Sequence, residues 1–282
     1  SRGLGDVYKR QIVNSRKLAQ ELFEEIPREG AFCLTTLLYP EHRKEKLREI
    51  KERLEHHVPC RVIATSLVEA GVDLDFPCVY RQENGLDALI QAAGRCNREG
   101  THSPEESKVY LFGLKGDASV YFAQNISALR QTLRCYEDPA APEAIAFYFK
   151  QYREILGREN LDQKKIMDAF TAGKGINGDC FPFATVAREF HLIENETQTV
   201  YIPVGEAELW IEEMEKGKVS RELMRKLGQY AVNVYPNHLK ALYDAGCVEG
   251  IGEGMYVLRD MNQYHEDTGL QMEVSTGYGL FG

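Results

Sequence analysis

The stretch AFCLTTLLYPEHRKEKLREIKERLEHHVPCRVIATS, residues 31–66, decides the fold. It opens and closes with short apolar runs, residues 31–35 and 61–65, that predict two strands. The segment between them starts at Pro40, a residue suited to the first turn of a helix, and repeats its apolar residues at helical spacing. A strand, a helix and a second strand in this order predict two parallel strands in an α/β layer.

The same alternation continues on both sides of this unit. A further strand is predicted to end at residues 12–13, and others to cover residues 78–81 and 109–112. Helices are predicted after residue 15 and over residues 86–95. Five strands with intervening helices predict a complete α/β lobe with a mainly parallel sheet.

The composition argues against several kinds of protein and site. The chain has 282 residues and a net charge of -9, which argues against a polybasic protein that neutralises phosphate over its whole surface. The seven cysteines form no C-x-x-C pair, so we expect reduced thiols of a cytoplasmic protein and no zinc site. The adjacent pair His56 and His57 lacks the spacing of a metal site. No segment approaches the roughly 18 apolar residues of a membrane span, so no membrane partner is expected.

The first eleven residues, SRGLGDVYKRQ, have neither a helical nor a strand period. The string LGDVYKRQ resembles translated adapter sequence at the ends of reading frames from environmental sequencing. We expect residues 1–11 to be such an artefact, with a natural disordered tail as the alternative.

Residues 64–75, ATSLVEAGVDLD, leave a predicted strand at the edge of the sheet where open α/β folds bind ligands. Thr65 and Ser66 offer hydroxyl and backbone N–H groups. Gly71 permits a turn, and Asp73 adds a carboxylate near the same edge. The pattern fits a phosphate site, and it equally fits a strand followed by a turn and a capping aspartate.

Residues 89–100, LIQAAGRCNREG, form the second stretch with chemical potential. At about 100° per residue, Gln91, Arg95 and Arg98 fall on one face of a single predicted helix. Gly94 has no side chain, which would let this face approach another surface closely. Arginine binds phosphate oxygens with two parallel hydrogen bonds. The alternative is a solvated basic helix face.

Together these stretches carry a family resemblance. ATSLVEAGVDLD and QAAGRCNR resemble motifs V and VI of superfamily 2 helicases. LVEAGVDLDFP with LDALIQAAGRCNREG is similar to the CRISPR-associated helicase-nuclease of type I interference systems. IVNSRKLAQELFEEI resembles motif IV of that family, and FPFATVAREFHLIE and YAVNVYPNHLKALYDAG resemble its accessory domain. The resemblance extends from residue 12 nearly to the end of the chain.

The resemblance implies a second RecA-like helicase lobe over residues 12–138, followed by a smaller, mixed, helix-rich α+β accessory domain over residues 139–282. In this family Arg98 would be the arginine finger on the γ-phosphate of ATP, and Arg95 would support it. Gln91 would position the attacking water or contact the phosphate.

The resemblance also implies the other ligand contacts. Gly71, Asp73 and Gly94 would line the ATP edge of the lobe. The DNA-contacting residues would be Thr65, Ser66, Asn14 and Thr35. Contacts to the DNA backbone are indifferent to base sequence.

The complete enzyme would translocate 3′ to 5′ along single-stranded DNA, recruited by the CRISPR surveillance complex (Cascade). ATP and Mg²⁺ would be held mainly by a first lobe, and a divalent metal by an N-terminal nuclease domain. This chain contains no G-x-x-x-x-G-K-[ST] phosphate loop, no acidic D-E-x-H box and no HD nuclease cluster. We therefore expect it to be inactive and to hold no cofactor by itself. The alternatives are a stand-alone DNA-binding or docking module and the second lobe of another superfamily 2 helicase.

Overall fold

A computed structural model describes residues 8–66, 74–114, 120–162, 164–172, 174–175, 178–179, 182–190 and 197–274. The chain divides into two compact units. One unit combines residues 1–82, 91–113 and 196–282, and the other combines residues 83–90 and 114–195. The first unit thus draws on both predicted domains, and a domain boundary at residue 139 stays a prediction.

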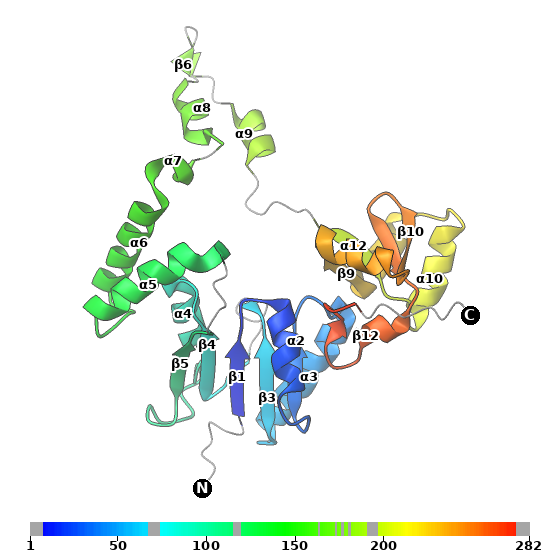
Figure 1. The fold of residues 1–282 in the computed structure, drawn as a ribbon, viewed down its shortest axis with the longest axis horizontal. Helices are drawn as coiled ribbons and strands as arrows, with labels where there is room; N and C mark the ends of the chain where they lie inside the picture. The colour runs from blue at the N-terminus through cyan, green and yellow to red at the C-terminus, as the bar shows by residue number, and fades with distance from the viewer. Residues whose placement is uncertain are drawn as a thin grey trace. The chain divides into compact units, whose positions relative to one another are not determined.

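The first unit contains a five-stranded sheet whose strand order is β2-β3-β1-β4-β5 and whose neighbouring strands are all parallel (Figure 1). Its strands are β1 (Tyr8–Ile12), β2 (Ala31–Leu34), β3 (Cys60–Ala64), β4 (Cys78–Gln82) and β5 (Lys108–Phe112). The connecting helices α2 (Arg16–Glu24) and α3 (Pro40–Glu55) belong to this unit, whereas α4 (Leu86–Ala93) is divided between the two units after residue 90. The predicted α/β fold with a parallel sheet is confirmed.

Strand β1 corrects one expectation from the sequence. Residues 8–11 form most of a strand that pairs with β3 on one side and β4 on the other. Hydrogen bonding to two neighbours fixes this backbone although its side chains, YKRQI, show no apolar alternation. The expectation that residues 1–11 form no structural element is therefore wrong for residues 8–11. Residues 1–7 lie outside the described part, and the origin of the segment stays a prediction.

A second, mixed sheet belongs to the same unit, with strand order β10-β11-β8-β9. Its strands are β8 (Gln198–Tyr201), β9 (Ala231–Val234), β10 (Val248–Gly252) and β11 (Met255–Leu258). The helices around it are α10 (Glu206–Glu215), α11 (Arg221–Leu227) and α12 (Pro236–Asp244). Helix α12 begins with Pro236, which suits the first turn of a helix. Trp210 packs edge-on against Tyr230 at 5.8 Å and so anchors α10.

The two sheets of this unit share a buried core. Leu37, which follows β2, is fully buried in a cluster with Val200, Val232 and Leu270. The buried amide of Gln20 on α2 donates to the carbonyl oxygens of Thr268 (3.2 Å) and Leu270 (3.0 Å). Its own oxygen accepts the N–H of Met272 at 3.0 Å. The C-terminal segment is therefore fastened to the parallel-sheet lobe by apolar packing and by a fully satisfied buried amide.

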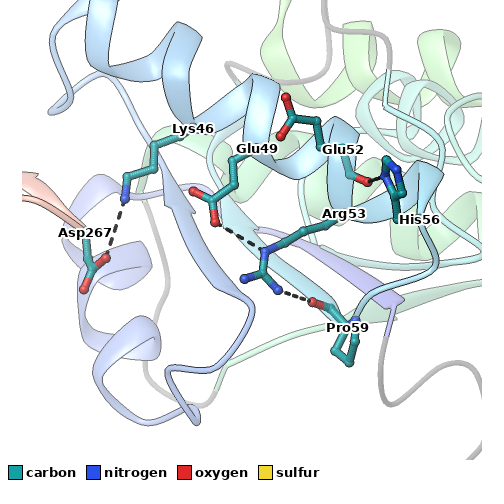
Figure 2. A network of polar contacts seen from close by, with 7 residues as sticks. All are labelled: Lys46, Glu49, Glu52, Arg53, His56, Pro59 and Asp267. Atoms are coloured by element: carbon teal, nitrogen blue, oxygen red, sulfur yellow. Dashed lines mark hydrogen bonds and ion pairs between the residues drawn. The ribbon is translucent and has the colours of Figure 1, made fainter.

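Helix α3 extends this attachment with aromatic and charged contacts. Tyr39 stacks against Tyr230 and Tyr264 at centroid distances of 5.3 and 5.4 Å. Lys46, near the middle of α3, reaches Asp267 at 3.7 Å (Figure 2). Near the C-terminal end of α3, Arg53 binds the carbonyl oxygen of Pro59 at 3.2 Å, which holds the turn into β3 (Figure 2).

The second unit is helical in most of its described residues. Its helices are α5 (Ala123–Cys135), α6 (Pro142–Leu156), α7 (Arg158–Leu161), α8 (Ile166–Ala172) and α9 (Phe183–Glu189), with short strands β6 (Lys174–Gly175) and β7 (Gly178–Asp179). Tyr148 is fully buried, whereas its neighbour Phe149 is 46% exposed, so the aromatic run of α6 is only partly core. Arg130 of α5 pairs with Glu83 at 2.9 Å.

The described residues bear on membrane spans, disulfide bonds and metal sites. Within them no helix has the length and apolar character needed to cross a bilayer. The cysteines of this part of the chain form no disulfide bonds. No group of three or more metal-ligating side chains was found there either.

Candidate functional site

Three predicted DNA-contacting residues follow three neighbouring strands of the parallel sheet. Thr35 comes directly after β2, Thr65 directly after β3, and Asn14 two residues after β1. Because these strands are adjacent and parallel, the three residues lie at the same, carboxyl edge of the sheet. The exposed Ser66 continues this edge.

The two threonines shape the turns at this edge. Thr35 is fully buried, and its hydroxyl oxygen accepts the N–H of Leu37 at 3.1 Å. Thr65 is 9% exposed, and its N–H donates to the carbonyl oxygen of Leu34 at 3.2 Å. The Thr35 hydroxyl therefore orders the turn after β2, and the backbone hydrogen bond of Thr65 continues the pairing of β3 with β2 up to the exposed Ser66.

Asn14 belongs to a buried polar network that sequence reasoning missed. The guanidinium of Arg81, which is 1% exposed, donates to the side-chain oxygen of Asn14 at 2.8 Å. The side chain of Gln82 in turn accepts the N–H of Asn14 at 2.8 Å. The signal in the sequence was an arginine and a glutamine at the end of an otherwise apolar strand, where buried polar residues need partners.

The residues around Arg98 are arranged differently from the expectation. Helix α4 ends at Ala93, so Gln91 lies on the helix whereas Arg95 and Arg98 do not. The exposed Gly94 begins a turn, and Asn97 has a left-handed backbone with a φ of 51°. The prediction that Gln91, Arg95 and Arg98 share one helix face is therefore wrong, because glycine and a left-handed asparagine interrupt the helix.

Asp75 holds the loop that carries Arg98. Its carboxylate accepts the N–H groups of Arg98 (2.8 Å) and Glu99 (3.1 Å). The preceding Cys96 pairs with Phe76 as a β-bridge. Burial raises the pKa of Cys96 to about 11, so its thiol stays protonated and donates to the carbonyl oxygen of Pro77 at 3.3 Å. The Arg98 side chain is exposed from this fixed backbone.

The candidate residues form two groups at opposite ends of one sheet. The Arg98 loop pairs with residues 75–76, which precede β4, whereas Asn14, Thr35 and Thr65 follow their strands. Gly71 and Asp73, predicted at the ATP edge, lie outside the described residues. The loop that carries Arg98 therefore lies at the amino edge of the sheet, whereas the hydroxyl and amide groups lie at its carboxyl edge.

Comparison with known proteins gives these groups a context. Residues 4–101 match the family described as CRISPR-associated nuclease/helicase Cas3, C-terminal. The match includes both groups of candidate residues.

Two curated relatives carry the same family name, CRISPR-associated nuclease/helicase Cas3. The protein from Haloferax volcanii is 28% identical over 159 residues, which cover 45% of this chain and 17% of the relative. The protein from Methanothermobacter thermautotrophicus is 25% identical over 131 residues, which cover 45% of this chain and 16% of the relative. The chain thus spans about one sixth of the length of these relatives.

Solved structures agree on the fold. The crystal structure of T. fusca Cas3 superposes with a TM-score of 0.56 at 15% identity, over 90% of this chain and 35% of that one. A structure described as a CRISPR RNA-guided surveillance complex, pre-nicking, has a TM-score of 0.51 at 14% identity, over 89% of this chain and 37% of that one. The family match over residues 4–101, the two curated relatives and the fold of the solved structures together support a C-terminal fragment of Cas3.

Proposed function

We propose that this chain supplies the second lobe and the accessory region of an ATP-driven, 3′ to 5′ single-stranded DNA translocase that degrades target DNA in type I CRISPR interference. Its relatives are named as nuclease/helicases. Solved structures of similar fold include T. fusca Cas3 with ATP, ADP and AMPPNP. The similarity to a structure described as a surveillance complex supports Cascade as the partner, in the cytoplasm of a prokaryote.

The observation that carries the proposal is the alignment of Asn14, Thr35 and Thr65 at the ends of three adjacent parallel strands. The polar residues and the N–H groups of the turns form a row, with neighbours about one strand spacing apart. Such a row can contact successive phosphates of a DNA backbone, which also repeat along a line. In this proposal Ser66 contributes its exposed hydroxyl, and the two threonines order the turns that face the DNA. Such contacts grip any base sequence.

The nucleotide side of the proposal rests on the Arg98 loop. An arginine finger stabilises charge that develops during phosphoryl transfer, an effect worth roughly 10³ to 10⁵ in rate in other nucleotide hydrolases. The exposed side chain of Arg98 and its backbone, anchored by Asp75, fit this role. Arg95 supports the finger, Gln91 faces the phosphate or the attacking water, and Gly94 allows close approach.

The cofactors of the complete enzyme follow from the same proposal. Gly71 and Asp73 line the ATP edge, while ATP and Mg²⁺ are held mainly by a first lobe and a divalent metal by a nuclease domain. The chain lacks a phosphate loop, so we expect it to bind single-stranded DNA without hydrolysing ATP unless a chain with that lobe is supplied.

The test is the Arg98→Ala variant in protein assembled with an ATP-binding lobe. DNA-stimulated ATP hydrolysis should fall at least about 10³-fold, whereas single-stranded DNA binding should stay within about twofold. The matched control is Arg225→Ala, which removes an exposed arginine from α11. Normal hydrolysis by Arg98→Ala would overturn the finger assignment. DNA binding without any stimulation of hydrolysis, in every assembly, would favour the stand-alone binding module instead.

A further inference from the structure

Tyr235 is exposed although its ring is held in a fixed orientation. It caps the N-terminus of α12, directly after β9, and Pro236 restricts the backbone that follows. Its side chain is 57% exposed. By contrast, Trp210 in the same unit packs against an apolar cluster, as an anchoring aromatic residue does.

Arg16 covers one face of the Tyr235 ring. The carbon at the centre of its guanidinium lies 4.8 Å from the ring centroid, a distance typical of a cation–π contact. The same guanidinium donates to the carbonyl oxygen of Asn233 at 3.0 Å and to the hydroxyl oxygen of Thr36 at 3.4 Å. One guanidinium nitrogen, Nη1, donates both hydrogen bonds, which fix the guanidinium beside the ring it supports.

These contacts bring the ring to the carboxyl edge of the parallel sheet. Arg16 lies two residues after Asn14, and Thr36 follows Thr35. Arg16, which covers the ring, and Thr36, which accepts a hydrogen bond from Arg16, therefore both lie at the edge that the proposed function assigns to the DNA backbone. The ring itself comes from the mixed sheet, so the two sheets meet at this point.

We infer that Tyr235, supported by Arg16, is a stacking platform for one base of the single strand that crosses this edge. The inference rests on the proposed function and adds a contact to a base where that function assigns only backbone contacts. An exposed aromatic ring with one covered face offers its other face to any base, because every base has a flat π-surface. A base held here would fix the position of the strand along the edge without selecting its sequence.

The test compares two fluorescent probes, a 20-nucleotide oligothymidylate and an abasic oligomer of equal length, by anisotropy with the full chain. Tyr235→Ala should weaken binding of the oligothymidylate about 5- to 100-fold, the range for loss of one base–aromatic stack. The same variant should leave binding of the abasic oligomer and the salt dependence unchanged, since phosphate contacts are intact. Tyr235→Phe, which keeps the ring, should bind both probes as the natural chain does.

Two further variants make the result specific. Tyr121→Ala removes a tyrosine that is 91% exposed and belongs to the other unit, and this variant should bind both probes normally. Arg16→Gln should lose part of the preference for the probe with bases, and combining it with Tyr235→Ala should add no further loss of that preference. That non-additivity separates positioning of the ring from a general loss of structure.

The possible failures are distinguishable. If the natural chain binds neither probe, the proposed DNA contact fails and the inference fails with it. If the natural chain binds both probes and Tyr235→Ala behaves like Tyr121→Ala, only the stacking platform is overturned. Equal loss of binding to the two probes by Tyr235→Ala would also overturn stacking, because an abasic strand has no base to stack.

Discussion

A Cβ atom at Gly269 would lie 2.3 Å from the carbonyl oxygen of Leu37. That same oxygen accepts the N–H of Leu270 at 3.0 Å. Gly269 also has a φ of 76°, a conformation that other residues rarely adopt. At this contact the backbone of the C-terminal segment packs directly against the backbone of the turn after β2, with no room for a side chain at residue 269.

Gly269→Ala should therefore destabilise the attachment between the two sheets. The left-handed backbone alone costs about 1–3 kcal/mol for a residue with a side chain, and displacement of the Leu37 backbone adds to this. Urea denaturation followed by circular dichroism measures the change in the free energy of unfolding.

Gly246→Ala is the matched control for this change. Gly246 has a φ of 70°, but a Cβ there would meet no atom within 4 Å. It should show the conformational cost without the clash, and so lose clearly less stability than Gly269→Ala. Equal losses would mean that the contact with Leu37 contributes nothing.

The sequence predicts the parallel-sheet lobe well because its signals are local. The strand from residue 31, the helix from Pro40 and the strand near residue 61 each show their own period and end signals. The end of α4 was missed because the arginine spacing suggested a continuous helix, whereas Gly94 and Asn97 break it. The end of β1 is predicted near residue 12, but its start at residues 8–11 is not, because pairing with two neighbours, rather than its own side chains, fixes it.

Contacts between distant parts of the chain could not be predicted at all. Gln20 bonds to residues about 250 positions away, and nothing in its own neighbourhood marks it as a buried clamp. The pairing of Arg81 with Asn14 joins the ends of two strands whose adjacency depends on the strand order. The residue type shows that a buried polar side chain needs a hydrogen-bond partner, but only the fold determines which residue provides it.

Two buried histidines should make this attachment sensitive to acid. His42 Nδ1 lies 2.8 Å from the Tyr264 hydroxyl, and His238 Nε2 lies 2.8 Å from the Gln271 carbonyl oxygen. Burial lowers the pKa of both histidines below the ordinary 6.5. Between the lowered folded pKa and the unfolded value of about 6.5, the unfolded state binds more protons than the folded state. Stability is therefore full above about pH 6.5 and falls as the pH drops below it.

Urea denaturation between pH 7.5 and pH 5 measures this effect. Each histidine can contribute a slope of at most about 1.4 kcal/mol per pH unit in that window. His42→Gln and His238→Gln should each flatten the slope, and the double variant should flatten it most. His265→Gln, which removes an exposed histidine from the same segment, should leave the slope unchanged. An undiminished slope in the double variant would contradict the assignment to these two groups.

Asp75 should matter for ATP hydrolysis although it would touch no nucleotide in the proposed function. Its carboxylate fixes the backbone N–H groups of Arg98 and Glu99, so Asp75→Ala should let the Arg98 loop move. A misplacement of about 1 Å can cost roughly 10²-fold in rate. In protein assembled with an ATP-binding lobe, we expect kcat to fall by that order while KM for ATP changes less.

Asp75→Asn tests positioning directly, because it keeps one oxygen that can accept the Arg98 N–H and should recover part of kcat. Asp244→Ala removes a carboxylate that pairs with Lys240 on α12 and should leave kcat unchanged. If Asp75→Asn were as impaired as Asp75→Ala, the negative charge rather than the position of the loop would be the cause.

Asn14 offers a way to separate DNA binding from folding at the carboxyl edge. Its side-chain oxygen accepts a hydrogen bond from the buried Arg81, so Asn14→Ala should leave that guanidinium short of a partner and cost about 1–3 kcal/mol of stability. Asn14→Asp keeps an oxygen in the same position, now charged, and should preserve stability because a charged acceptor binds arginine more strongly.

The added negative charge of Asn14→Asp should nevertheless repel a DNA backbone. We therefore expect Asn14→Asp to fold as stably as the natural chain in urea denaturation and to bind oligothymidylate more weakly, with the difference shrinking as salt screens the charge. Glu21→Gln, on the neighbouring helix, should change neither property. A stable Asn14→Asp variant with unchanged DNA affinity at low salt would remove Asn14 from the proposed DNA contact and leave it a purely structural partner of Arg81.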